Sequence, residues 1–216
     1  MNILGGETIL FTGDSITDCG RGRPIGRGAE LGSGYVSLID SCWAATNPEK
    51  VITVLNTGIS GNRATDLERR WQSDVLDIAP NWLSIMIGIN DVWRQFDNSD
   101  VEQVGVELYE KVLRKLLEQT RNSLKGLVLM TPYFIEPDTS DPMRKQMDRY
   151  SSIVERLAGE FNAIFVNTQA AFDRYLLHRS LESLCEDRVH PNQTGHMIIA
   201  REFIDTVESS CKTPSA

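Results

Sequence analysis

Five short apolar runs, separated by longer amphipathic stretches, constrain the fold of this 216-residue chain more than any other feature. Each run is bounded by Gly, Pro, Asn or a charged residue. The runs cover residues 8–12, 51–56, 82–87, 127–131 and 164–167. Strands that alternate with helices are typical of a parallel sheet covered by helices. The pattern therefore predicts an α/β protein with a five-stranded parallel sheet.

The stretches between the runs predict five helices. They cover residues 35–45, 65–76, 101–120, 141–161 and 194–209. In the third, Leu108, Val112 and Leu116 recur at the spacing that places side chains on one helix face. In the fourth, Ile153 and Leu157 do the same. We interpret these stripes as core-facing surfaces rather than cofactor-binding segments.

Composition and charge indicate a single globular domain that works on a small, weakly charged substrate. The chain is 41% hydrophobic and 24% charged, and we expect one domain over residues 1–211 with a loose C-terminal tail at 212–216. A net charge of −8, with Arg and Lys scattered along the chain, argues against nucleic acid as a partner. No apolar run approaches the roughly 18 residues that span a bilayer. We therefore expect no membrane partner.

The four cysteines carry neither a CxxC spacing nor the histidine pattern of a zinc site. They are Cys19, Cys42, Cys185 and Cys211. Reduced, structural cysteines are typical of the cytoplasm, and a secretory signal pattern is lacking at the N-terminus. We predict a cytoplasmic protein with no metal and no cofactor.

Two distant segments supply the ionisable groups of a serine hydrolase. Gly13-Asp14-Ser15 follows the first apolar run, so the Ser15 hydroxyl is expected at the end of a buried strand. His190 is one of three histidines, and Asp187 precedes it by three residues. Ser15, His190 and Asp187 are therefore the candidate nucleophile, general base and orienting carboxylate.

Hydrolysis of an ester also needs hydrogen-bond donors for the oxyanion that forms on the attacked carbonyl. Gly61 follows the second run, where the missing side chain lets its backbone N–H approach a ligand. Asn90 follows the third run and can direct its amide into the cleft. With the N–H of Ser15, these groups make three candidate donors. The Gly- and Arg-rich segment 17–34 is expected to form a wall of the site.

These blocks closely resemble those of the SGNH (GDSL) hydrolases, whose invariant residues are Ser, Gly, Asn and His. Gly13-Asp14-Ser15, Gly61, Gly88-Ile89-Asn90-Asp91 and the segment from Asp187 to His190 occur in the matching order, and the resemblance covers about residues 9–204. It implies a flavodoxin-like three-layer α/β/α sandwich. It also implies that Ser15 is the nucleophile, that Gly61 and Asn90 complete the oxyanion hole, and that His190 and Asp187 complete the triad.

Within that family the chain most resembles the bacterial intracellular acetylxylan esterases. Stretches 13–21, 84–95, 130–133, 141–144 and 188–197 are similar to their pattern. The chain departs from it at Glu186, because those enzymes are expected to carry an aromatic residue directly before the triad aspartate. This difference alters one wall of the expected pocket.

Several further residues are candidates for binding substrate. They are Asp14, Asn62, Trp93, Arg94, Tyr133 and Phe134, most of them at strand ends, where packing and pocket-lining roles both remain open. Asp14 is expected to accept hydrogen bonds rather than exchange protons. His178 and His196 are expected to be surface or packing residues on helices. Arg21, Arg23 and Arg27 are interpreted as solvated loop charges, since the Lys-Ser/Thr ending of a nucleotide-binding loop is missing.

We predict a metal-independent serine esterase that removes acetyl groups from carbohydrate hydroxyls, with acetylated xylo-oligosaccharides as the substrate. A lysophospholipase or thioesterase of the same superfamily is the alternative enzyme, and chain-length preference separates the two. A catalytically inactive flavodoxin-like binding module is the alternative of another class. Homo-oligomers among similar enzymes imply that this chain also self-associates.

Overall fold

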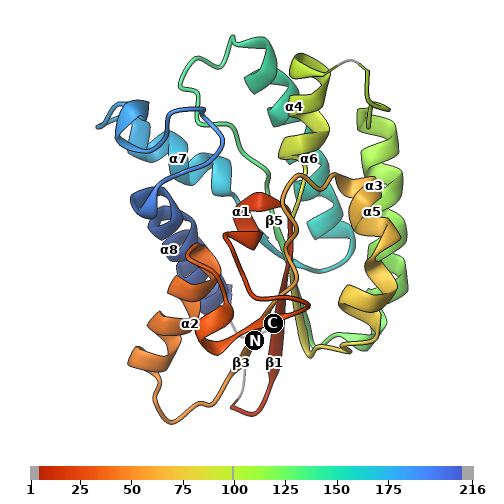
Figure 1. The fold of residues 1–216 in the computed structure, drawn as a ribbon, viewed down its shortest axis with the longest axis vertical. Coiled ribbons are helices and arrows are strands. Elements are labelled where there is room, and N and C mark those ends of the chain that lie inside the picture. The colour runs from red at the N-terminus through yellow and green to blue at the C-terminus, as the bar shows by residue number, and fades with distance from the viewer. Residues whose placement is uncertain (1–4, 99, 211–216) are drawn as a thin grey trace.

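A computed structural model describes residues 5–98 and 100–210, which form helices packed on a central six-stranded sheet (Figure 1). The tail expected at residues 212–216 lies outside the described residues. The strands are β1 (Thr8–Gly13), β2 (Gly26–Arg27), β3 (Thr53–Asn56), β4 (Trp82–Met86), β5 (Gly126–Met130) and β6 (Ile164–Val166). Their order across the sheet is β2-β3-β1-β4-β5-β6. Without β2, this is the 2-1-3-4-5 order of a flavodoxin-like fold.

The expected number of strands was wrong by one. The five predicted strands are present and mutually parallel, with ends shifted by at most two residues. The additional strand, β2, pairs antiparallel with β3 through Gly26 and Arg27. A two-residue strand within a Gly- and Arg-rich loop has neither an apolar run nor an alternating pattern, so the sequence carried no signal for it.

Helices cover both faces of the sheet and make the predicted three-layer sandwich. Helices α2, α7 and α8 lie on one side of the sheet in Figure 1, and α3, α5 and α6 lie on the other, with α4 beside α6. The helices are α1 (Ser15–Asp18), α2 (Tyr35–Thr46), α3 (Ala64–Arg69), α4 (Ile89–Asp97), α5 (Val106–Thr120), α6 (Pro142–Glu160), α7 (Thr168–Leu176) and α8 (Gln193–Ser210).

Three of these helices were not predicted, and two predicted ones differ from the observed bounds by more than one residue. Helices α1, α4 and α7 span four, nine and nine residues, too short to show a clear helical repeat. The helix predicted at 101–120 begins only at Val106, after Gly105. The helix predicted at 65–76 ends at Arg69 and continues as a π-helical segment, Gln72–Leu76.

The core lies along the central strands, whose side chains are buried on both faces. In β1, Ile9, Leu10 and Phe11 are fully buried, and every residue of β4 and β5 is buried. This explains why these strands read as continuous apolar runs rather than as alternating ones. Among the described residues, no helix is long and apolar enough to cross a membrane.

The strand order brings three chain segments to one place. Because β3, β1 and β4 are adjacent and parallel, their carboxyl ends lie side by side at the same edge of the sheet. Gly61, Ser15 and Asn90 follow these three strands, respectively. The point where the strand order reverses is where open α/β sheets bind ligands.

Candidate active site

Ser15 sits on a sharp turn between β1 and α1. Asp14 caps this short helix, because its Oδ1 accepts a hydrogen bond from the N–H of Ile16 at 3.0 Å. The turn needs glycine at position 13, where a Cβ atom would lie 2.1 Å from the carbonyl oxygen of Met86. Ser15 is therefore presented at the first residue of a short helix, directly after a position that only glycine can occupy.

The predicted triad residues form a continuous chain of hydrogen bonds. Ser15 Oγ lies 3.0 Å from His190 Nε2, and His190 Nδ1 lies 2.6 Å from Asp187 Oδ2. Asp187 Oδ1 also accepts the backbone N–H groups of Val189 (3.0 Å) and His190 (2.8 Å). Burial raises the pKa of Asp187, but its hydrogen bonds with His190 and these N–H groups outweigh burial and hold the pKa below its ordinary value. Asp187 is thus a carboxylate at neutral pH.

The three predicted oxyanion donors converge beside Ser15. Gly61 has φ = 80°, a left-handed conformation that favours glycine. Among the described residues, the N–H groups of Ser15 and Gly61 have no protein acceptor. The Asn90 amide donates one hydrogen to the carbonyl oxygen of Asn62 at 3.0 Å, which leaves its second N–H for a ligand.

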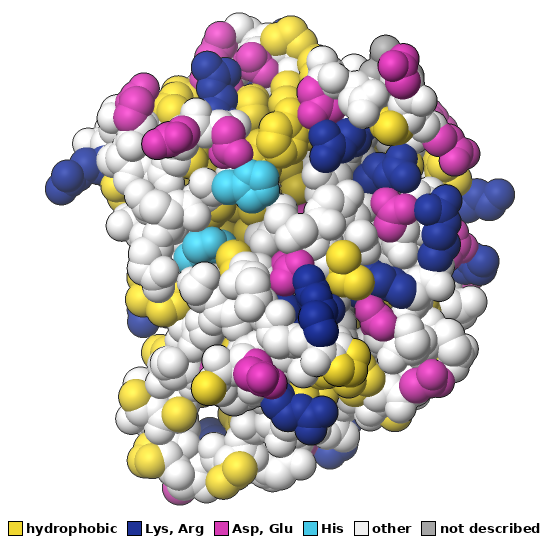
Figure 2. Space-filling model, viewed as in Figure 1, with side chains coloured by type: hydrophobic (Ala, Val, Ile, Leu, Met, Phe, Trp, Pro, Cys, Tyr) yellow, Lys and Arg dark blue, Asp and Glu magenta, His cyan; other side chains and the backbone are white. Residues whose placement is uncertain are grey.

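These groups line a cavity of about 550 Å³. Its walls are formed by Ser15, Ile16, Cys19, Ser60, Gly61, Asn90, Trp93, Arg94, His190, Pro191 and His196. Figure 2 shows histidine side chains beside a patch of apolar ones on this face of the molecule. The Trp93 ring lies 5.9 Å from the His190 ring, and the Arg94 guanidinium lies 5.6 Å from the centre of the Trp93 ring. Of the predicted substrate-binding residues, Trp93 and Arg94 are therefore in the cavity.

A second cavity, of about 430 Å³, adjoins the first at His190 and Pro191. Its lining includes three carboxylates, those of Glu182, Glu186 and Asp187. Glu186, the residue that departs from the expected aromatic, is exposed on this wall. The wall is therefore acidic next to the candidate base.

The other four predicted substrate-binding residues do not line the cavity. Asp14, Tyr133 and Phe134 are only 1%, 2% and 6% exposed. The Tyr133 hydroxyl donates to the carbonyl oxygen of Val189, and the Phe134 backbone N–H donates to Gln169. Asn62 accepts a hydrogen bond from Arg70 Nε at 2.7 Å through its side chain. These side chains hold the loops around the site instead of facing it, because the strand-end segments fold back into the core.

Two lining residues with ionisable side chains, Cys19 and His196, were missed. His196 was expected to be a surface or packing residue, but it faces the cavity from α8 and is buried, and burial lowers its pKa to about 4. Its Nδ1 accepts from the N–H of Tyr35, so Nε2 carries the proton and donates to Cys19 Sγ at 3.3 Å. Cys19 and His196 are 177 positions apart, and no local pattern links them. His178, also expected on a helix, is exposed in the turn after α7.

A three-layer α/β fold with a Ser-His-Asp hydrogen-bonded chain at the carboxyl ends of its strands defines a serine hydrolase arrangement. Residues 11–198 match the model of the GDSL-like lipase/acylhydrolase family. The chain belongs to this family.

Among characterised relatives, an acetylxylan esterase of Geobacillus stearothermophilus is 50% identical over 208 residues, which cover 94% of this chain and 95% of the relative. The crystal structure of Axe2, an acetylxylan esterase from the same organism, superposes with a TM-score of 0.94 and 49% identity, covering 96% of each chain. LAE5, an α/β hydrolase from the metagenome of Lake Arreo, superposes with a TM-score of 0.93 and 43% identity, covering 95% of this chain and 97% of LAE5.

Three further Axe2 structures carry catalytic mutations. The substituted residues are a serine, an aspartate and a histidine. These are the same three residue types that meet in the hydrogen-bonded chain of this protein.

Proposed function

We propose that this protein is a serine esterase that removes acetyl groups from the hydroxyls of acetylated xylo-oligosaccharides. The observation that carries the proposal is the hydrogen-bonded chain from Ser15 Oγ through His190 to Asp187, with three donors beside it. This arrangement supplies a nucleophile, a base and an oxyanion hole in one cavity.

In the proposed reaction, His190 Nε2 accepts the proton of Ser15 Oγ as that oxygen attacks the ester carbonyl. The resulting oxyanion is bound by the N–H groups of Ser15 and Gly61 and by the Asn90 amide. When the C–O bond of the ester breaks, the imidazolium returns its proton to the departing sugar oxygen. Water then attacks the acetyl-Ser15 ester by the same steps and releases acetate. Asp187 stabilises the imidazolium in both half-reactions and stays ionised itself.

Two features support a carbohydrate as the alcohol part of the substrate. Trp93 presents an aromatic face next to His190, where the leaving oxygen must lie to receive its proton, and Arg94 adds a donor beside it. The relatives with acetylxylan esterase activity are about half identical to this chain over nearly its full length. Glu186 sets the wall of the adjoining cavity apart from the aromatic wall expected in such enzymes.

The test is acetate release from acetylated xylo-oligosaccharides, with the positions of the remaining acetyl groups followed by NMR. The wild-type protein should remove acetyl groups, and Ser15→Ala, as the matched control, should not. On aryl esters, turnover should fall from acetyl to butyryl to octanoyl, since each misplaced methylene costs about 1–3 kcal/mol.

Other outcomes would reject parts of the proposal. Faster turnover of octanoyl than of acetyl esters would favour a lysophospholipase or thioesterase. Deacetylation of other sugars, with xylo-oligosaccharides untouched, would keep the reaction and reject the substrate. Complete inactivity on every acetate ester would favour a binding module.

We further propose that the protein is a cytoplasmic homo-oligomer built from single-domain subunits. Free thiols at Cys19, Cys42 and Cys185 support the cytoplasm. The proposal of self-association rests on the resemblance to enzymes that form homo-oligomers. Light scattering after gel filtration should give a multiple of 24.2 kDa, and a mass of one subunit would reject the oligomer.

A further inference from the structure

The three oxyanion donors come from three separate elements, so their relative positions must be fixed by contacts between those elements. We propose that two buried carboxylates, Asp18 and Asp91, are positioning residues that hold the loop carrying Gly61 against α1 and α4. The inference rests on the proposed function, because it takes the Gly61 N–H as an oxyanion donor. Asp18 lies on the helix that begins with Ser15, and Asp91 directly follows Asn90.

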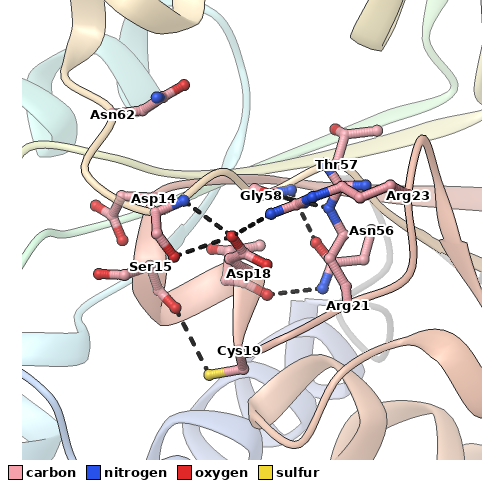
Figure 3. Close-up of polar contacts among 12 residues, drawn as sticks. Asp14, Ser15, Asp18, Cys19, Arg21, Arg23, Asn56, Thr57, Gly58 and Asn62 are labelled. Carbon is pink, nitrogen blue, oxygen red and sulfur yellow. Dashed lines mark hydrogen bonds and ion pairs between the residues drawn. The ribbon is translucent and has the colours of Figure 1, made fainter.

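Asp18 fixes the residue before Gly61. Its Oδ2 accepts the backbone N–H and the hydroxyl of Ser60, both at 2.9 Å, and pairs with Arg23 Nη2 at 2.6 Å. Figure 3 shows Asp18 and the guanidinium of Arg23 side by side below the loop. The carboxylate is only 2% exposed. The backbone of Ser60 is therefore tied to α1, which also carries the N–H of Ser15.

Asp91 fixes the chain after Gly61. Its carboxylate is fully buried, and its two oxygens lie 3.0 and 3.2 Å from the N–H of Ala64, the first residue of α3. Its neighbour Asn90 bonds the carbonyl oxygen of Asn62. The loop is thus tied to α4 by two adjacent residues, one of which is itself an oxyanion donor.

Arginine side chains brace the same loop. Arg70 donates to the carbonyl oxygens of Thr57 (2.7 Å) and Gly13 (2.8 Å), and so bridges the loop to the nucleophile turn. Arg21 Nε donates to the carbonyl oxygen of Gly58 at 2.8 Å and is buried. The expectation of a solvated loop charge was therefore wrong for Arg21, because the segment after α1 folds over the loop and gives it buried acceptors. Arg23 is exposed, as expected, although it pairs with the buried Asp18. Arg27 is exposed, as expected.

These contacts matter because Gly61 has no side chain to fix its own backbone. An oxyanion hole acts only when its donors are held within about 0.5 Å of the required geometry. Burial raises the pKa of Asp18, but its bonds with Arg23 and Ser60 outweigh burial and hold the pKa below the ordinary value. Asp18 is therefore ionised at neutral pH, and its bonds to Ser60 are charge-assisted and strong.

Substitution of Asp18 by Ala tests the proposal on the intact protein, because it removes the acceptor of both Ser60 bonds. Asp18→Ala should lower kcat for an acetyl ester by about 10- to 100-fold, somewhat less than the loss expected when a donor is removed outright. KM should change less than twofold, because the ground-state ester has no oxyanion. Affinity for methylboronic acid, which forms a tetrahedral adduct with a serine hydroxyl, should fall by the same factor as kcat/KM.

Arg23→Gln is the matched control, since it removes the ion pair of Asp18 but leaves both bonds to Ser60. It should keep kcat within about threefold of wild type, as expected for a substitution that leaves the three oxyanion donors in place. An equal loss of kcat in Arg23→Gln would overturn the proposal, as would unchanged kcat or an effect confined to KM in Asp18→Ala. Circular dichroism establishes that each variant is folded.

If Asp18→Ala does not fold, Asp91→Ala, which removes the acceptor of the Ala64 N–H, decides the question with the same readouts. An unimpaired Asp91→Ala would then overturn the proposal. An inactive wild-type protein would instead count against the proposed function. An active wild type, with Ser15→Ala inactive and both aspartate variants unimpaired, would reject only the positioning role.

Discussion

Ser15 is held by few side-chain contacts for a residue at the centre of a site. Among the described residues, His190 Nε2 is the side-chain partner of its hydroxyl. Ser15→Ala should therefore leave the thermal unfolding midpoint within about 2 °C of wild type, as expected of a change that removes one exposed hydrogen bond. It should lower kcat by about 10³-fold or more. Near-normal turnover, or a covalent serine reagent found on another residue by mass spectrometry, would exclude Ser15 as the nucleophile.

In the proposed mechanism, the Asn90 amide has both a structural and a chemical role. One N–H donates to the carbonyl oxygen of Asn62, and the second is proposed to bind the oxyanion. Asn90→Ala should lower kcat by roughly 10²–10³ with a smaller change in KM, because the oxyanion exists only in the transition state. Steady-state kinetics on an aryl acetate measure both constants. A change in KM alone would show that Asn90 binds the substrate instead.

At the scale of elements, helix α1 is capped at its N-terminus by the buried side chain of Asp14. Burial raises the pKa of Asp14 from 3.8 to about 7. Because the pKa in the folded protein exceeds that in the unfolded chain, ionisation of Asp14 lowers the free energy of unfolding as pH rises from about 4 to about 7. At about 1.4 kcal/mol per pKa unit, ionisation of Asp14 lowers the free energy of unfolding by at most about 4 kcal/mol.

Asp14→Asn keeps a good cap and removes the charge. The variant should therefore be more stable than wild type at pH 8 and nearly equal to it at pH 4. Urea unfolding at the two pH values measures the difference. A variant that is less stable than wild type at pH 8 would contradict the assigned direction of the pKa shift.

The elements that could be predicted from the sequence are those with a long or fully apolar pattern. The strand that ends at Gly13 and the helix that carries Val112 and Leu116 are of this kind. The short α4 was not predicted, although Asn90 at its start was named from the order of motifs. The Cys19–His196 contact and the bonds from Asp18 to Ser60 join distant positions, and only the folded chain brings them together.

At the scale of the whole molecule, the proposed chemistry is carried by side chains and backbone groups alone. Activity should therefore be unchanged after prolonged incubation with excess EDTA, because the proposed nucleophile is Ser15, activated by His190, rather than a metal-bound water. The measurement is the initial rate on an acetyl ester before and after chelation. Loss of activity that a divalent ion restores would overturn the mechanism. Among the described residues, no group of three or more His, Cys, Asp or Glu is placed to hold a metal ion.

The proposed nucleophile and the proposed base lie on different kinds of structure. Ser15 follows a central strand that is buried from Ile9 to Gly13, whereas Asp187 and His190 lie on a surface loop between α7 and α8. That loop is fastened to the segment after β5, where the Ile135 N–H donates to the carbonyl oxygen of Arg188 and the Tyr133 hydroxyl to that of Val189. Local unfolding that breaks these two hydrogen bonds would move His190 away from Ser15 while the rest of the fold stays intact. In hydrogen exchange, the amides of peptides covering residues 181–191 should exchange faster than those of peptides covering 8–14. Tyr133→Phe should increase this difference in exchange rate.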